Sequence, residues 1–497
     1  MNAVRETSPS AMQERKLRLA AALAQVLAPQ SILVDREALK PYECDGLSAY
    51  RETPLVAVIP ANEEELTAVL KVARETRTAV VARGSGTGLS GGALPLADGI
   101  LLSLAKFNRV VSVDAVARKA RVQPGVTNLK ISQAVAPLGL YYAPDPSSQI
   151  ACSIGGNVAE NSGGVHCLKY GLTVHNVSKL RAITIEGDVI DFGSEALDTP
   201  GYDLLALAHG SEGLLAVTLE VTVKLLAKPE LSQCIMASFP DVESAGRAVA
   251  SVIGAGIVPA GLEMMDKLAT RAVEDFVHAG YDLEAEAILL AEADGCCDDV
   301  AYEIAKMSEV MRASGATQIR VSKDDAERLR FWSGRKAAFP AVGRISPDYY
   351  CIDGSIPRAA LSRVLSSIGE FSSRYGLRCA NVFHAGDGNL HPLILYDANI
   401  PGELDTTERF AADILELCIE VGGTITGEHG VGIEKINQMC SQFRPAELAQ
   451  FHAVKAAFDP DGLLNPGKAV PTLHRCAEYG AMRVKGGALP HPELPRF

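Results

Sequence analysis

One stretch near the end of the chain, HAGDGNLHPLIL at 384–395, combines two histidines with turn-forming residues. Its Gly-Asp-Gly sequence predicts a turn between two strands, and Pro392 excludes a helix. The turn would place His384 and His391 on neighbouring strands, where both imidazoles can face one space. Histidine pairs are often ordinary structural residues, but the flanking glycines favour a functional pair.

A second stretch, GGTITGEHGVG at 422–432, supplies Glu428 and His429 between glycines. Two histidines and one carboxylate, with an open coordination position, are the ligand set of a catalytic zinc or similar divalent ion. Adjacent residues of an extended segment point to opposite sides, so we expect only one of Glu428 and His429 to join such a set. The two stretches together predict a divalent metal site.

A third stretch, RGSGTGLSGG at 83–92, follows an apolar run at 79–82 that predicts a short buried strand. Its five glycines allow backbone N–H groups to approach a ligand and form a concave anion site, usually for phosphate. It is not a P-loop, because Gly-Lys-Ser/Thr is absent, and its spacing is not G-x-G-x-x-G. A flexible surface loop is the alternative.

A fourth stretch, PDPSSQIACSIGGNVAENSGG at 144–164, has the same glycine- and hydroxyl-rich character. Two such segments far apart in the chain, each beside strand-like sequence, indicate one long ligand held from two sides. A dinucleotide with a central pyrophosphate fits this description.

With these motifs the chain resembles the FAD-linked oxidases of the vanillyl-alcohol oxidase and p-cresol methylhydroxylase superfamily, and within it the flavoprotein subunits of glycolate oxidases. The resemblance extends from about residue 40 to beyond residue 480. It implies an FAD-binding role for residues of both glycine-rich stretches and of two later segments: Arg83, Gly84, Ser85, Gly86, Thr87, Gly88, Pro144, Asp145, Ser148, Ser153, Gly155, Gly156, Asn157, Asn161, Gly163, Glu212, Gly213, Val217 and Asn465. Covalent members attach flavin through a histidine, often within the glycine-rich loop. No histidine lies in 83–92, so we expect non-covalent FAD.

The resemblance also implies roles for the chemically active residues. His384, His391 and Glu428 match ligands of a divalent metal, zinc or manganese, whereas His429 matches the residue that acts on the substrate hydroxyl. Arg335 matches the arginine that binds the substrate carboxylate, for which a planar guanidinium is suited. A 2-hydroxy acid would then lose its hydride to flavin and its hydroxyl proton to His429.

Composition narrows the class of protein. With 497 residues the chain predicts two to four domains, and its formal net charge of −13 argues against nucleic acid and anionic membrane surfaces as partners. No apolar run is long enough to span a membrane and no secretory signal is evident, so we expect a cytoplasmic protein. The eleven cysteines form no C-x-x-C pair, which predicts neither an iron–sulfur cluster nor a zinc ribbon. The resemblance implies that a companion FAD-domain subunit and an iron–sulfur subunit carry the electrons onward and associate the chain with a membrane.

The elements that must position these residues alternate between helix and strand, which predicts an α+β fold. We expect a two-subdomain FAD-binding domain of the p-cresol methylhydroxylase type, then an α+β substrate or cap domain and a helical C-terminal segment. The expected boundaries are 1–50 for an N-terminal helix and linker, 51–228 for the FAD-binding domain, 229–470 for the cap with the C-terminal oxidase segment, and 471–497 for a tail. The main elements expected are helices at 11–28, 62–77, 127–138 and 298–313, strands at 55–60, 99–104, 110–114, 119–123, 232–239 and 287–292, and a hairpin at 179–193.

The function expected from the resemblance is FAD-dependent oxidation of glycolate, and of D-lactate, to the 2-keto acid by the catalytic subunit of a glycolate oxidase complex. The alternatives are a stand-alone D-lactate or D-2-hydroxyglutarate dehydrogenase, an alkyl-dihydroxyacetonephosphate synthase-like enzyme, and a non-catalytic FAD-binding subunit.

Overall fold

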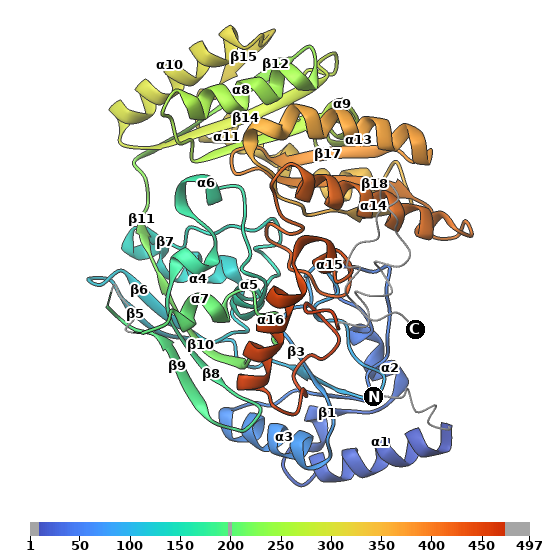
Figure 1. The fold of residues 1–497 in the computed structure, drawn as a ribbon. Helices are drawn as coiled ribbons and strands as arrows, with labels where there is room; N and C mark the ends of the chain where they lie inside the picture. Colours follow the sequence, from blue (N-terminus) through green and yellow to red (C-terminus); the bar gives the residue numbers. More distant parts are fainter. Residues whose placement is uncertain (1–8, 197–200, 473–497) are drawn as a thin grey trace.

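The computed structural model describes residues 9–196 and 201–472 (Figure 1). The predicted tail, apart from its first two residues, lies outside the described residues. The structure confirms the predicted mixture of helices and strands. The N-terminal part, residues 9–227, contains a four-stranded, a five-stranded and a two-stranded sheet, the last formed by β7 (Leu140–Tyr141) and β11 (Leu226–Ala227), and the remainder of the chain contains a seven-stranded sheet, here called the cap sheet.

The first sheet of the N-terminal part has the order β1-β2-β4-β3, in which β2 and β3 both pair parallel with β4. Helices α1 and α3 pack on it and bury leucines and valines against its strands. Asn62 caps α3 by accepting a hydrogen bond from the Glu65 N–H, as its position before an acidic first turn predicts. The elements are α1 (Pro9–Leu23), β1 (Ile32–Leu33), α2 (Arg36–Leu39), β2 (Val56–Val58), α3 (Glu63–Glu75), β3 (Val80–Arg83) and β4 (Ile100–Ser103).

The second sheet is antiparallel and has the order β5-β6-β10-β8-β9. The predicted hairpin at 179–193 forms its β8 and β9, and α4 ends near Gly139, whose φ of 69° is the left-handed conformation that stops a helix. The elements are β5 (Val110–Asp114), β6 (Lys119–Val122), α4 (Asn128–Val135), β7 (Leu140–Tyr141), α5 (Ile154–Glu160), α6 (Cys167–Tyr170), β8 (Val177–Ile183), β9 (Val189–Gly193), α7 (Leu204–Ala208), β10 (Val217–Lys224) and β11 (Leu226–Ala227).

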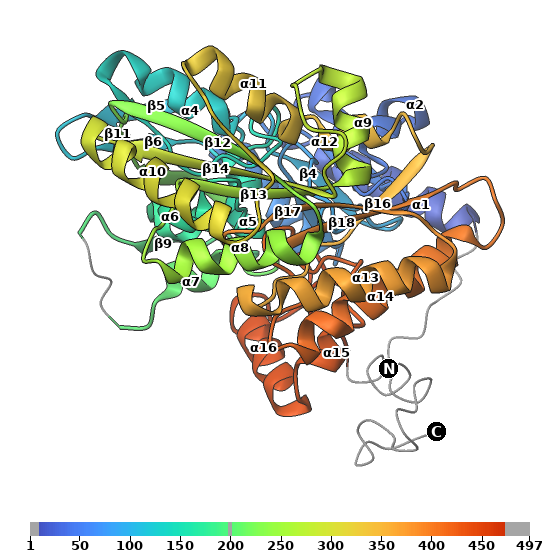
Figure 2. The ribbon, with the colours of Figure 1, turned by 90° about the horizontal axis from the view of Figure 1, so that it is seen from above.

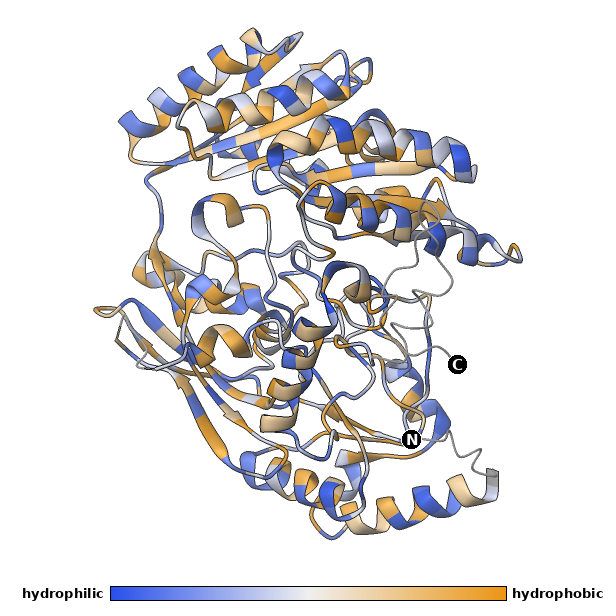
Figure 3. Ribbon diagram, viewed as in Figure 1, coloured by the Kyte–Doolittle hydropathy of each residue, from blue (hydrophilic) through white to orange (hydrophobic). Residues whose placement is uncertain are grey.

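The cap sheet is antiparallel, with the order β15-β12-β14-β13-β17-β18-β16. Alternate residues of a strand face opposite sides, so Leu289 and Ala291 of β14 enter one core while Ile288 and Leu290 enter the other. Helices α8, α10, α13 and α14 cover the first face, and α9, α11 and α12 cover the second (Figure 2). Figure 3 shows the resulting hydrophobic strands between helices of mixed polarity.

The elements of this region are β12 (Leu231–Phe239), α8 (Val242–Gly254), β13 (Gly261–Asp266), α9 (Lys267–Val277), β14 (Ala287–Gly295), α10 (Cys297–Ala313), β15 (Gln318–Val321), α11 (Asp325–Lys336), α12 (Ala338–Val342), β16 (Asp348–Cys351), α13 (Leu361–Tyr375), β17 (Cys379–His384), β18 (Asn389–Tyr396), α14 (Glu403–Glu420), α15 (Met439–Gln442) and α16 (Pro445–Phe458).

The end of the described chain returns to the N-terminal part (Figure 1). Leu464 forms a parallel bridge with Val80 of β3, and the Lys455 ammonium donates to the Leu214 carbonyl. The chain therefore passes from the first sheet to the cap sheet and back, which brings residues of its two ends to the same site.

Candidate active site

A cavity of about 390 Å³ lies where the N-terminal part meets the helices of the cap sheet. Most of the predicted FAD-binding residues line it: Arg83, Gly84, Ser85, Gly86, Thr87, Gly88, Ser148, Ser153, Gly155, Gly156, Asn157, Glu212, Gly213 and Val217. The two glycine-rich stretches meet directly, because a Cβ on Gly84 would lie 2.1 Å from the Ser153 hydroxyl oxygen. One elongated ligand can therefore contact both.

The other predicted FAD-binding residues do not line the cavity. Asn465 donates from its side-chain amide to the carbonyls of Gly92 and Glu212, at 2.9 and 2.7 Å, and so joins two lining segments. Asp145 accepts from Nδ1 of His166 at 2.9 Å, and Asn161 accepts from the Val174 N–H. Pro144, which precedes Asp145, and Gly163, which lies beside Glu428, are also outside the lining of the cavity.

Gly163 lies against Glu428, one of the three predicted metal ligands. A Cβ at this position would lie 2.6 Å from Oε2 of Glu428, so only glycine leaves room for that carboxylate. The contact brings the end of the 144–164 stretch beside the predicted metal ligands, at the border of the cavity.

The predicted turn between β17 and β18 does place His384 and His391 side by side. Their ring centroids are 5.0 Å apart with an angle of 84° between the planes. Nε2 of His391 lies 2.8 Å, and Nε2 of His384 3.3 Å, from the same Oε1 atom of Glu428. One ligand atom from each of the three residues lies within 4.8 Å of the others, the spacing of a set that could hold one ion.

The outer nitrogens of these histidines have partners that orient the rings. Nδ1 of His384 lies 2.8 Å from Oε1 of Glu263, a residue of β13, and Nδ1 of His391 lies 3.3 Å from the Ile352 carbonyl. Such contacts turn both Nε2 atoms toward Glu428, which is the arrangement of metal-ligating histidines. The three residues therefore fit a divalent ion.

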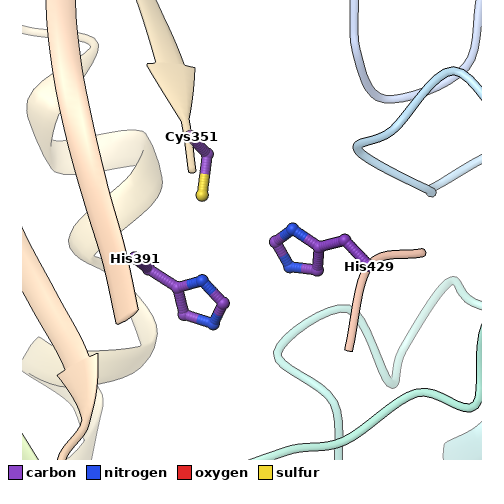
Figure 4. Close-up of side chains that lie close together, drawn as sticks. All are labelled: Cys351, His391 and His429. Atoms are coloured by element: carbon purple, nitrogen blue, oxygen red, sulfur yellow. The ribbon is translucent and has the colours of Figure 1, made fainter. Parts of the chain in front are cut away.

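A second trio that shares His391 fits an ion less well. Cys351, His391 and His429 approach one another at the edge of the cap sheet (Figure 4). The imidazoles of His391 and His429 are stacked, 4.8 Å apart with 6° between their planes. The lone pairs of imidazole nitrogens lie in the ring plane, so two parallel rings do not direct them at one point.

His429 lies where the cavity borders the metal-ligand candidates. It lines the cavity together with His391, Glu428, Lys336 and Tyr349. Its Nε2 lies 3.6 Å from Oε1 of Glu428. Burial lowers the pKa of His429 to about 4, despite the opposing attraction of Asp353, so the imidazole is neutral near pH 7 and can accept a proton.

Asp353 holds the segment that carries Glu428 and His429, and the sequence analysis did not identify it. This fully buried carboxylate follows β16 and accepts from one hydroxyl, three backbone N–H groups and one ammonium: Thr426, Gly427, Glu428, His429 and Lys435. Burial would raise the pKa of Asp353, but the positive charge of Lys435 holds it well below its ordinary value. The available signal was a carboxylate directly after an apolar segment, Asp353 at the end of DYYCID.

Arg335 does not line the cavity. It is 1% exposed on α11, and its Nε donates to Oε2 of Glu263 at 2.7 Å. Glu263 therefore connects Arg335 with His384. The buried Nη2 group of the guanidinium donates no hydrogen bond within residues 9–196 and 201–472, so both of its N–H donors are free. Its neighbour Lys336 does line the cavity.

A cavity lined by two glycine-rich stretches, with a histidine beside a histidine–carboxylate set at its border, fits a flavoprotein of the oxidase class. Two family models match the chain, the FAD binding domain at residues 54–193 and the C-terminal domain of FAD linked oxidases at residues 228–469. The chain belongs to the FAD-linked oxidases, as the sequence predicted, and binds FAD.

Relatives of known name are similar over nearly the whole chain. Glycolate oxidase subunit GlcD of Escherichia coli (strain K12) is 63% identical over 476 residues, which cover 96% of this chain and 95% of the relative. The protein of the same name from Bacillus subtilis (strain 168) is 36% identical over 90% of this chain and 95% of its own length. The structure of p-cresol methylhydroxylase with substrate bound has a TM-score of 0.78 at 16% identity, covering 93% of this chain and 98% of that one, and shares the fold.

No helix among the described residues is long and apolar enough to cross a membrane.

Proposed function

We propose that this chain oxidises glycolate to glyoxylate with FAD, as the catalytic subunit of a glycolate oxidase. The observation that carries the proposal is the position of His429, which lines the FAD cavity and stands 3.6 Å from the carboxylate that His384 and His391 share. A candidate base and a candidate metal set thus border the cavity that would hold FAD. The 63% identity with glycolate oxidase subunit GlcD supports glycolate as the substrate.

When bound, FAD supplies the hydride acceptor and a divalent ion lowers the pKa of the substrate hydroxyl. The residues of the protein supply the base and the ligands for the metal. His429 accepts the hydroxyl proton, since the ring is neutral near pH 7. His384, His391 and Glu428 would hold a zinc or manganese ion in the space that they border.

The family resemblance makes Arg335 the proposed clamp for the substrate carboxylate, although its side chain lies beside the lining of the cavity and not in it. Its Nη2 is a buried donor without a partner among the described residues, and Glu263 fixes the guanidinium through Nε. A carboxylate that accepts from Nη2 would satisfy this donor. Because Glu263 also contacts His384, the clamp and the proposed metal ligand are positioned by one carboxylate.

The test is a substrate panel followed at the flavin absorbance under anaerobic conditions, with glycolate, D-lactate and D-2-hydroxyglutarate, each with and without a chelator. We expect the fastest bleaching with glycolate and a large loss after chelation. Preference for D-lactate or D-2-hydroxyglutarate would identify a stand-alone dehydrogenase of that acid instead. No bleaching with any hydroxy acid would favour a synthase-like or non-catalytic role.

The word subunit in the names of the relatives supports a second proposal, that companion chains reoxidise the flavin. We expect a companion FAD-domain subunit and an iron–sulfur subunit. The purified chain with glycolate should reduce an artificial dye but not quinone. Fast quinone reduction by the chain alone would show that companions are not required.

A further inference from the structure

Two carboxyl groups face each other at the wall of the FAD cavity, and the proposed function uses neither for chemistry. Glu160 ends α5 and Glu212 precedes β10, and both line the cavity. The position that a Cβ of Gly430 would take lies 2.0 Å from Oε2 of Glu160 and 3.1 Å from Oε1 of Glu212. Both groups therefore meet at the segment that follows His429.

The two carboxyl groups have very different partners. Glu212 accepts the Val431 N–H on Oε1 and the Gly432 N–H on Oε2, each at 2.7 Å. Two strong N–H donors stabilise an ionised carboxylate. Oε2 of Glu160 is buried, and no hydrogen bond to it occurs in the part of the chain that the structure describes.

An ionised carboxylate is costly to bury without a partner, and a second negative charge beside Glu212 would add repulsion. The nearest charged groups do not remove this conflict: Asp45 adds a further negative charge, while Lys435 and Lys468 supply the positive ones. Lys435 is already paired with Asp353 and Lys468 donates to the carbonyls of Gly92 and Leu94. Burial and the charges of Glu212 and Asp45 raise the pKa of Glu160 well above its ordinary value. Burial raises the pKa of Glu212 too, but its two N–H donors oppose the shift.

We propose that Glu160 keeps its proton at neutral pH and donates a hydrogen bond from its carboxyl group to an acceptor atom of bound FAD. A neutral carboxyl group has one O–H donor. Its side chain lines the cavity, and Oε1 lies 2.8 Å from the position of a Gly92 Cβ, beside the first glycine-rich stretch. Because Oε2 is buried against Gly430, the proton would be carried by Oε1, on the side of the first glycine-rich stretch. FAD carries acceptor oxygens and nitrogens along its length, one of which would accept from it. Glu212 is the ionised member of the pair and fixes the Val431–Gly432 backbone.

The experiment measures the FAD dissociation constant of the apoprotein by quenching of flavin fluorescence, for the unmodified chain and for Glu160→Gln and Glu160→Met. Both side chains match glutamate closely in length, but only the amide can donate. We expect Glu160→Gln to bind FAD within about threefold of the unmodified chain and Glu160→Met to bind about tenfold more weakly, the worth of one neutral hydrogen bond. Glu212→Gln should weaken binding, because an amide N–H would then face a backbone N–H.

Equal weakening by glutamine and methionine would show that the ionised form of Glu160 is needed and overturn the proposal. Unchanged binding by the methionine variant would show that Glu160 makes no contact with FAD and would also overturn it. Should the methionine variant not fold, Glu160→Ala removes the same donor without demanding space. No substrate is added, so the result does not depend on which hydroxy acid the enzyme oxidises, and binding of FAD by the unmodified chain is checked in the same titration.

Discussion

Asp353→Asn tests how firmly the segment with Glu428 and His429 is held. Oδ2 of Asp353 accepts from Thr426, His429 and Lys435 at 2.6, 2.9 and 3.1 Å, and Oδ1 accepts from the N–H groups of Gly427 and Glu428 at 3.2 and 3.1 Å. Asparagine keeps one acceptor oxygen and replaces the other with a donor that must face existing donors. It also leaves the Lys435 ammonium, which is fully buried, without its main counter-charge.

The magnitude follows from these contacts. A hydrogen bond to an ionised group contributes about 1.5–3 kcal/mol, and two are lost on the oxygen that becomes an amide. Breaking a buried ion pair costs about 3–5 kcal/mol, and the two estimates describe overlapping losses. We therefore expect the free energy of unfolding, measured by urea titration, to fall by about 3–5 kcal/mol. Displacement of His429 by about 1 Å should slow flavin reduction by saturating glycolate about 100-fold.

Two further variants separate the effects on stability and on chemistry. Asp353→Asn combined with Lys435→Met leaves no charge of this pair unpaired, so it should recover part of the stability without restoring flavin reduction. Asp294→Asn is the matched control, because Asp294 is a buried carboxylate paired with Lys169 at 2.6 Å that does not line the cavity. It should lower stability and leave flavin reduction unchanged. A loss below about 1 kcal/mol for Asp353→Asn, with normal flavin reduction, would refute the reasoning.

His429→Ala should slow flavin reduction by about 10²–10⁴-fold with FAD still bound, and a normal rate in stopped-flow absorbance would contradict the role of His429 as base. Removing the metal with a chelator should lower turnover without releasing FAD, and His384→Ala should lower the metal content measured by mass spectrometry; full turnover by metal-free protein would end the metal proposal. Gly163→Ala places a Cβ 2.6 Å from Oε2 of Glu428 and should lower metal affinity at least tenfold, whereas Gly369→Ala, with no atom within 4 Å of the added Cβ, should not. Equal metal affinity in the two alanine variants would show that Glu428 is not a ligand.

Local patterns were enough to predict many of the helices and strands and the pairing of two candidate site residues. The Gly-Asp-Gly turn identified the pairing of His384 with His391, because a turn between two strands brings their ends together whatever the rest of the fold is. The glycine-rich stretches were predictable for a similar reason, because the conformational freedom of glycine follows from its lack of a side chain and needs no knowledge of the fold. Both predictions rest on neighbours in the sequence.

The residues that hold this site in place could not be predicted in the same way. Glu263 is 121 positions from His384 and contacts it only because β13 pairs with β17 in the cap sheet. Asp353 reaches Lys435 across 82 positions, and Gly163 meets Glu428 across two parts of the chain. No spacing rule connects such residues, because their proximity follows from strand order. The available clue was a charged residue within an apolar strand, as for Glu263, or just after one, as for Asp353. Such a clue does not indicate which residue the charge pairs with.

The segment 427–432 shows how the two parts of the molecule define one active site. Its first half is fixed by the cap sheet, since Asp353 accepts the N–H groups of Gly427, Glu428 and His429. Its second half is fixed by the N-terminal part, since Glu212 accepts the N–H groups of Val431 and Gly432. His429 lies between the residues held by Asp353 and those held by Glu212, so the position of its side chain relative to the cavity depends on both carboxylates. Any shift of one part against the other therefore moves the proposed base relative to FAD, while His384 and His391, which belong to the cap sheet alone, stay with their strands.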